Sequence, residues 1–243
     1  KYDDAEPHLK RALAISEQNL GPNNPQFAVV LSNLAEIYAY QARYSDAEPL
    51  LKRSLTIREQ ALGPDHLHVA LSVENLARLF DARERYGEAE ALFRRSLAIS
   101  EKVLGPDHID IAAALDNLAL VYHKQGRYRD VEPLFLRALK IYEKFQGPEH
   151  PTTINHLQKL ATLYGRIGRY KKAVAIYKRL IEVEKALLGL EHPSVLLNLN
   201  NLAVVFKIQG RYLEAEQLHQ KVLETREKIL KPNHPSTAAS INN

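Results

Sequence analysis

The sequence predicts an all-α protein, a solenoid of stacked antiparallel helix pairs. The first observation is a tyrosine series with a spacing of 42 residues: Tyr2, Tyr44, Tyr86, Tyr128, Tyr170 and Tyr212. The second is a glycine series with the same spacing: Gly21, Gly63, Gly105, Gly147 and Gly189. The third is that apolar residues within each repeat recur with the ~3.6-residue period of an amphipathic helix. Several series with one period indicate repeats that bury their apolar faces against one another.

The first helix of each repeat, here called the first-type helix, is predicted from an apolar stripe. In the repeat that begins near Asn24, this helix runs from Pro25 to Ala42. Its stripe consists of Phe27, Val30, Leu31, Leu34, Ala35 and Tyr38. Proline suits the first turn because the N–H that it lacks has no partner within the helix. Arg43 and Tyr44 are expected to form the tight turn that follows.

The second helix, here called the second-type helix, is predicted over Ser45–Leu62. Its stripe consists of Ala47, Leu50, Leu51, Leu55 and Ile57. Gly63 can adopt the left-handed conformation that ends a helix, and Pro64 prevents the helix from continuing. Small residues at Ala35 and Ala47 allow the two helix axes to approach to roughly 8–10 Å.

The repeats account for the whole chain as a single solenoid domain. The expected parts are a partial repeat at 1–24, full repeats at about 25–66, 67–108, 109–150, 151–192 and 193–234, and a truncated helix at 235–243. The chain starts without methionine and inside an expected helix, so we interpret it as an internal part of a longer protein.

Composition argues against several classes of protein. The 33 basic and 29 acidic residues are interleaved and leave a net charge of only +4, which does not favour a nucleic-acid-binding tail. The apolar runs are much shorter than the ~18 residues of a membrane span, and we expect a cytoplasmic protein without membrane contact. Cysteine is absent, which excludes disulfides and thiolate metal sites.

One repeat shows a family resemblance in Leu34, Ala35 and Tyr38, then Arg43 and Tyr44, then Ala47. This pattern resembles the tetratricopeptide repeat. The 42-residue period and the Gly-Pro-Asp-His sequence that closes two of the repeats are similar to the kinesin-light-chain branch of that family. The resemblance extends over essentially the whole chain. It implies a right-handed superhelix in which the first-type helices line a concave groove that holds a partner peptide.

The resemblance also implies candidate groove residues. Several members of the family use an asparagine just before the Leu-Ala pair to hold the ligand backbone. The chain has asparagine at this place in four repeats: Asn33, Asn75, Asn117 and Asn201. In the remaining repeat the residue is Lys159. Side-chain amides can satisfy the main-chain groups of an extended peptide. The alternative is that these asparagines bond neighbouring helices and only maintain the stack.

Charge divides the expected groove lining into two parts. The first part is mixed to acidic: Glu36, Tyr40, Glu74, Arg78, Asp81 and Asp116. The later part is basic: His123, Lys124, Lys159, Arg166 and Lys207. We expect Lys124, Lys159, Arg166 and Lys207 to select an acidic segment of a partner. The alternative is a solvated helix face.

Other residue series are expected to be structural. The histidines at 42-residue spacing are His66, His108, His150, His192 and His234. Equivalent points of adjacent repeats lie about a helix diameter apart, roughly 10 Å, which is too far for a shared zinc. The glutamates Glu6, Glu48, Glu90, Glu132 and Glu216 are expected to form helix-surface pairs. No phosphate-binding loop or nucleophile elbow occurs, so we expect no catalytic residue, metal or cofactor.

The sequence therefore predicts a scaffold that binds a protein or peptide in its groove rather than an enzyme. A second interpretation is a regulatory or sensor region of a larger enzyme or signalling ATPase. A third, RNA binding by helical repeats, is disfavoured by the 42-residue period and the nearly balanced charge.

Overall fold

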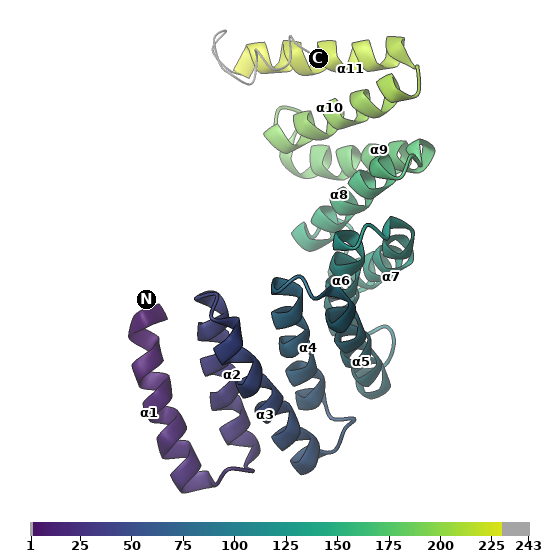
Figure 1. Cartoon of the computed structure of the whole chain (residues 1–243). Helices are drawn as coiled ribbons and strands as arrows, with labels where there is room; N and C mark the ends of the chain where they lie inside the picture. Colours follow the sequence, from purple (N-terminus) through teal and green to yellow (C-terminus); the bar gives the residue numbers. More distant parts are fainter. Residues whose placement is uncertain (1, 230–243) are drawn as a thin grey trace. The chain divides into compact units, whose positions relative to one another are not determined.

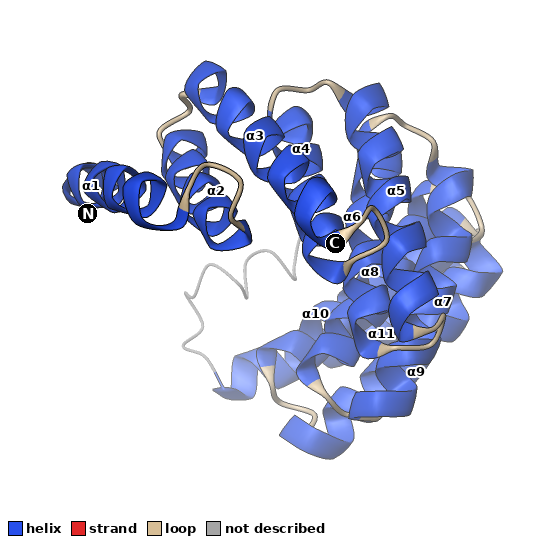
Figure 2. Cartoon of the chain, turned by 90° about the horizontal axis from the view of Figure 1, so that it is seen from below, coloured by secondary structure: helices blue, strands red, loops and turns tan. Residues whose placement is uncertain are grey.

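The computed structural model describes residues 2–229, which contain eleven α-helices and no strand (Figures 1 and 2). The helices are α1 (Tyr2–Leu20), α2 (Pro25–Tyr40), α3 (Tyr44–Leu62), α4 (Leu67–Ala82), α5 (Tyr86–Leu104), α6 (Ile109–Lys124), α7 (Tyr128–Gln146), α8 (Pro151–Arg166), α9 (Tyr170–Leu188), α10 (Pro193–Ile208) and α11 (Tyr212–Ile229). The all-α prediction is confirmed for this part of the chain. The predicted truncated helix at 235–243 lies outside the described residues.

The chain divides into two compact units, Lys1–Leu134 (unit 1) and Phe135–Asn243 (unit 2). In unit 1, α1 packs on α2, and the order continues α2 on α3, α3 on α4, α4 on α5 and α5 on α6. In unit 2, α8 packs on α9, α9 on α10 and α10 on α11. Each helix therefore contacts mainly its neighbours in sequence, as in stacked repeats. The single domain over 1–243 stays a prediction.

The helices end where the glycine series predicts. Three second-type helices, α3, α5 and α9, are followed by Gly63, Gly105 and Gly189, all with positive φ. Each first-type helix begins after an Asn or His whose side chain accepts a backbone N–H of the first turn. These capping residues are Asn24, His66, His108, His150 and His192. Local sequence thus defines both ends of the loop between repeats.

The turn inside each repeat differs slightly from the prediction. Tyr44 is the first residue of α3 rather than part of the turn, which consists of Gln41, Ala42 and Arg43. The backbone N–H of Arg43 donates to the carbonyl of Tyr38 at 2.8 Å, and Ala42 has a φ of 57°. A left-handed residue followed by this longer-range bond ends α2 abruptly. Tyr44 is therefore free to begin the next helix.

The small residues lie at the centre of the packing. The alanines at 42-residue spacing on the first-type helices are all 0% exposed: Ala35, Ala77, Ala119, Ala161 and Ala203. Ala47, Ala89 and Ala173 on second-type helices are equally buried. A larger side chain at these positions would force the helix axes apart.

Two junctions between repeats also contain buried polar pairs. In unit 1, Arg58 of α3 donates to the hydroxyl of Ser72 on α4 at 2.7 Å and to the carbonyl of His68 at 3.2 Å. Burial lowers the pKa of Arg58. In unit 2, the amide of Asn198 on α10 donates to the Glu184 carboxylate of α9 at 2.6 Å. These pairs occupy the same register positions of different repeats, yet their chemistry differs.

Candidate functional site

Each described first-type helix has an exposed side at the same register positions. Core positions such as Leu34 and Ala35 cover one side of each helix, and residues at spacings of four, three and four form a stripe on the other. The stripes, fully or partly exposed, are Val29, Asn33, Glu36 and Tyr40 on α2; Leu71, Asn75, Arg78 and Ala82 on α4; Ala113, Asn117, Leu120 and Lys124 on α6; Asn155, Lys159, Thr162 and Arg166 on α8; Leu197, Asn201, Val204 and Ile208 on α10. We call this surface the first-type face.

Seven of the eight predicted groove residues lie on the first-type face. The exception is Lys207, which is exposed one position before Ile208. Asn33, Asn75, Asn117 and Lys124 belong to unit 1, whereas Lys159, Arg166, Asn201 and Lys207 belong to unit 2. The predicted basic set is thus divided between two units, and only three of its four cations share one unit.

In unit 1, two predicted groove residues are bonded to the neighbouring first-type helix. The Asn117 amide donates to Glu74 Oε1 at 3.0 Å, and Lys124 Nζ donates to the two oxygens of Asp81 at 2.7 and 2.9 Å. Both bonds join α6 to α4. At Asn117 the bond is of the kind that the alternative interpretation expects between neighbouring helices, and the role of this residue in ligand binding stays a prediction. The charge of Lys124 is offset by Asp81.

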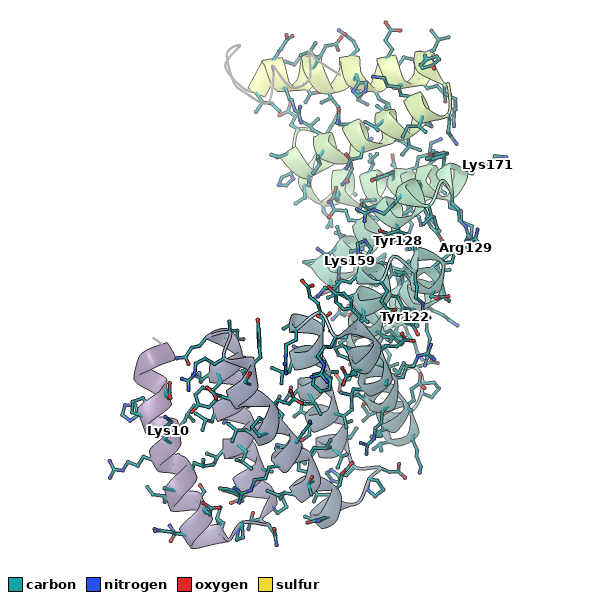
Figure 3. The ribbon with its side chains drawn as sticks, in the orientation of Figure 1. Lys10, Tyr122, Tyr128, Arg129, Lys159 and Lys171 are labelled. Atoms are coloured by element: carbon teal, nitrogen blue, oxygen red, sulfur yellow. The ribbon has the colours of Figure 1, made fainter. Side chains whose placement is uncertain are left out.

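In unit 2, the basic residues of α8 lie on one face. Lys159 and Arg166 are seven residues apart and exposed, so they stand about two helical turns from each other. Figure 3 labels Lys159 on this helix. The α8 part of the first-type face therefore presents two exposed cationic side chains. Lys207, on α10, adds a positive charge near His219 of α11: burial lowers the pKa of His219, and the charge of Lys207 lowers it further.

The α10 part of the first-type face is apolar, which was not predicted. Leu197, Val204 and Ile208 are 48%, 40% and 56% exposed, and the half-buried Asn201 lies between them in the stripe. Almost every residue of α10 is apolar or Asn, so the hydrophobic period does not distinguish its exposed side from its core side. Only the 42-residue register, which aligns α10 with the other first-type helices, identifies these apolar residues as exposed.

A pocket in unit 1 was also not predicted. It lies between α2, α3 and α4, has a volume of about 330 Å³, and includes Glu36, Tyr40, Asn75 and Arg78 of the first-type face in its lining. Two Glu74 contacts, at 2.7 and 3.1 Å, hold the guanidinium of Arg78. Glu36 and Tyr40 appear among the expected lining of the acidic part of the groove, but the hollow itself depends on residues that the sequence pattern did not single out.

The histidine series performs the expected structural role in the described residues. The Nδ1 atoms of His66, His108, His150 and His192 accept backbone N–H groups two residues later, at 3.1–3.3 Å. His234 lies outside the described residues. Within the described part of the chain no group of three His, Cys, Asp or Glu side chains could hold a metal ion. In the same part, no helix combines the length and apolar character of a membrane span.

The glutamate series connects repeats as well as turns of one helix. Glu48 accepts from Lys52 at 2.7 Å within α3 and also pairs with Arg83 and Arg85 of the next repeat. The hydrogen bond from Lys52 lowers the pKa of Glu48, and the two arginines lower it further. Glu90 has the equivalent pairs with Arg94 and Arg127. These carboxylates are ion-pair centres between repeats rather than a paired-carboxylate active site.

Comparison with known structures supports the repeat assignment. The chain is similar to kinesin light chain nearly identical TPR-like repeats of Podosopora anserina, with a TM-score of 0.72, 26% identity, and coverage of 86% of this chain and 99% of that one. YrrB, a TPR protein with an unusual peptide-binding site, gives a TM-score of 0.60 at 15% identity over 97% and 98% of the two chains. A signal transduction ATPase with a tetratricopeptide repeat sensor from Pyrococcus horikoshii gives 0.61 at 18% identity, over 96% of this chain and 33% of that one.

None of the curated proteins compared with the chain matches it. Family models do match. Models described as tetratricopeptide repeat match residues 1–60, 26–102, 70–144 and 110–186, and a further one matches 199–236. Together with the helix pairs, the 42-residue period and the buried alanines, these matches show that the chain belongs to the tetratricopeptide repeat family.

Proposed function

We propose that the chain is a protein-interaction scaffold that holds an extended segment of a partner against its first-type face. The observation that carries the proposal is the regular exposure of this face. In each of the five described first-type helices the core side is buried, while the opposite stripe is exposed or half-buried and presents an amide together with charged or apolar side chains. Within each unit such stripes offer main-chain hydrogen bonds, charge selection and apolar contacts to a bound segment.

In unit 2 the partner segment is acidic and apolar. Lys159 and Arg166 attract carboxylates, with charge-assisted hydrogen bonds of about 1.5–3 kcal/mol where they are well made. Exposed pairs are weaker, about 0.2–1 kcal/mol. Leu197, Val204 and Ile208 supply the apolar contacts that electrostatics alone lacks. The half-buried Asn201 amide lies within that stripe and is available to the main chain of the segment.

The test is selection of peptides from a phage-displayed random library on the 243-residue chain. Selected peptides should be enriched in Asp or Glu next to Leu, Ile or aromatic residues. The double variant Lys159→Glu with Arg166→Glu should weaken binding by roughly tenfold or more, because attraction becomes repulsion. Binding to the parent should also weaken as salt rises.

The matched control is Lys171→Glu with Lys185→Glu, which makes the same charge change on exposed positions of α9, a second-type helix. It should bind the peptides as the parent does. If the first-type variant binds as tightly as the control, α8 is only a solvated face and the acidic-segment proposal fails.

A second function is supported by one comparison. The Pyrococcus horikoshii protein is a signal transduction ATPase with a tetratricopeptide repeat sensor, and the match covers 33% of its length. The chain would then serve as the sensor region of a larger protein. Sequencing the full gene distinguishes the two, since an ATPase domain in the same polypeptide would favour the sensor.

A further inference from the structure

The pocket in unit 1 exists because one junction lacks side chains that the next junction has. Between α4 and α6 the space is filled by Glu74, bonded to Asn117, and by Asp81, bonded to Lys124. One repeat earlier, the equivalent positions between α2 and α4 are Ser32, Asn75, Ala39 and Ala82, and all four line the pocket. Two alanines thus replace an ion pair, and a serine replaces a carboxylate.

The serine does not fill the gap. The Ser32 hydroxyl is turned inward, donating to the carbonyl of Ala28 at 3.1 Å and lying 2.8 Å from the Ser54 hydroxyl. Asn75 therefore has no counterpart of the carboxylate that Asn117 bonds. Within the described part of the chain the half-buried Asn75 amide has no hydrogen-bond partner. It can donate to a main-chain carbonyl of a bound segment and accept from its N–H.

The charge of the pocket is negative. Glu36 is exposed at its rim and has no ion-pair partner among the described residues. Arg78, at the equivalent position of α4, is already bonded to Glu74 through two nitrogens. The carboxylate of Glu36 is consequently the charge in the lining that lacks a partner of opposite sign.

The remaining lining is aromatic and aliphatic. Tyr40, 61% exposed, and Tyr44 contribute rings, whose faces attract cations. The walls include Leu51 and Leu79 together with the small alanines. An aliphatic wall that leads to tyrosine rings and a carboxylate matches a side chain with a methylene stem and a cationic end.

We infer that this pocket binds a lysine or arginine side chain of an extended partner segment. The methylene stem packs on the alanine and leucine walls, the cationic end lies between Glu36 and the tyrosine rings, and Asn75 bonds the main chain of the segment. The inference rests on the proposed role in binding partner segments, but it concerns unit 1 and the opposite charge from the acidic-segment site of unit 2.

The test uses side-chain probes rather than a partner. The chain is labelled at alanine methyl groups, and NMR titrations are recorded with Nα-acetyl-lysine N-methylamide, its arginine analogue, and the norleucine and glutamate analogues. The lysine and arginine probes should shift the methyl signals of Ala39 and Ala82 in a saturable way. Norleucine, which has the same stem without the charge, should bind more weakly.

Two variants test whether the charge of Glu36 and the open space at Ala39 and Ala82 are needed for probe binding. Glu36→Gln should weaken the lysine probe by about two- to fivefold, as expected for a partly exposed charge pair, while Glu149→Gln, an exposed carboxylate of unit 2, should leave it unchanged. Ala39→Asp with Ala82→Lys rebuilds the ion pair of the next junction and should abolish the shifts of the pocket's remaining alanine, Ala35, without loss of helicity.

Equal binding of norleucine and lysine, a preference for glutamate, or no shift with any probe would each overturn the inference. None of these results bears on the peptide selection that tests unit 2, because no partner is used and the reporter alanines lie in unit 1. Conversely, loss of the acidic-segment proposal would leave the probe titrations unaffected.

Discussion

At the residue scale, residues with different conformational free energies occupy the positive-φ position of the turn inside each repeat. The turn inside each repeat needs a left-handed residue, which is Gly126, Gly168 and Gly210 in later repeats but Ala42 and Glu84 in the first two full repeats. A residue with a Cβ pays about 1–2 kcal/mol for this conformation, whereas glycine does not. The first two turns therefore carry backbone strain that the later turns avoid.

Replacing Ala42 by glycine should stabilise the protein. The gain is expected to be about 0.5 kcal/mol, since relief of strain exceeds the extra entropy of glycine in the unfolded chain. The reverse change, Gly126→Ala, should destabilise by about 1 kcal/mol, and it does so through φ alone because an added Cβ has nothing within 4 Å. Denaturant unfolding of both variants measures the two values. A destabilised Ala42→Gly would contradict the assignment of strain.

Some residue-scale features could be predicted and others could not. The capping histidines and terminating glycines act within a few residues, so local sequence reveals them. The Asn117–Glu74 and Lys124–Asp81 bonds join residues 43 apart in the chain. Predicting them requires knowing that neighbouring first-type helices are offset by one residue, so that contacting residues are 43 apart rather than one period of 42. Without that offset, the sequence pattern does not reveal that Lys124 is paired with Asp81.

At the element scale, helix approach depends on the alanine series. Ala119 of α6 is completely buried, and Ala119→Leu should destabilise by roughly 1–3 kcal/mol through overpacking. The exposed Ala113 on the same helix provides the control, since Ala113→Leu adds the same atoms without a neighbouring core. Thermal or denaturant unfolding measures both. Equal stability of the two variants would mean that the alanine series does not set the helix crossing.

Successive helix pairs of unit 1 are also connected by glutamate. The pKa of Glu48 is lowered in the folded protein, so its contribution to stability is present above the unfolded pKa and is lost as pH falls through the folded pKa. Glu48→Gln should lower Tm at neutral pH. Between pH 7 and about pH 3, the same variant should lose less stability than the parent, because its ion pairs are already absent. Parallel Tm curves for the two proteins over this range would rule out this linkage.

At the scale of the whole molecule, the fold was predictable because short sequence signals define each helix and recur from repeat to repeat. A 3.6-residue stripe, a terminating glycine and a capping residue define each helix, and the 42-residue register multiplies the signal. The site was predictable only as a face. The unit 1 pocket arises because Ser32, Ala39 and Ala82 are smaller than the equivalent residues of the next repeat, Glu74, Asp81 and Lys124. Replacing a polar side chain by a smaller one at these positions does not change the hydrophobic period.

The buried polar pairs belong to this scale as well. Arg58 with Ser72 and Glu184 with Asn198 occur at one register position in different repeats. Mispairing of repeats would bury Arg58 or Glu184 without its partner, which would destabilise the folded protein by about 3–5 kcal/mol. The pairs therefore favour the correct order of stacking, which identical apolar junctions would not specify.

The central claim is that a partner segment lies on the first-type face, and the absence of cysteine makes it directly testable. Single cysteines are introduced at Thr162 on α8, Val204 on α10 and the exposed Glu182 on the second-type helix α9. A library-selected peptide that carries an activated disulfide is then added, and the rate of cross-linking is measured at a concentration near Kd. Thr162→Cys and Val204→Cys should react at least about tenfold faster than Glu182→Cys, because binding raises the local concentration of the peptide's activated disulfide beside the protein thiol that attacks it. Equal rates at the three positions, or faster reaction at Glu182→Cys, would contradict the account.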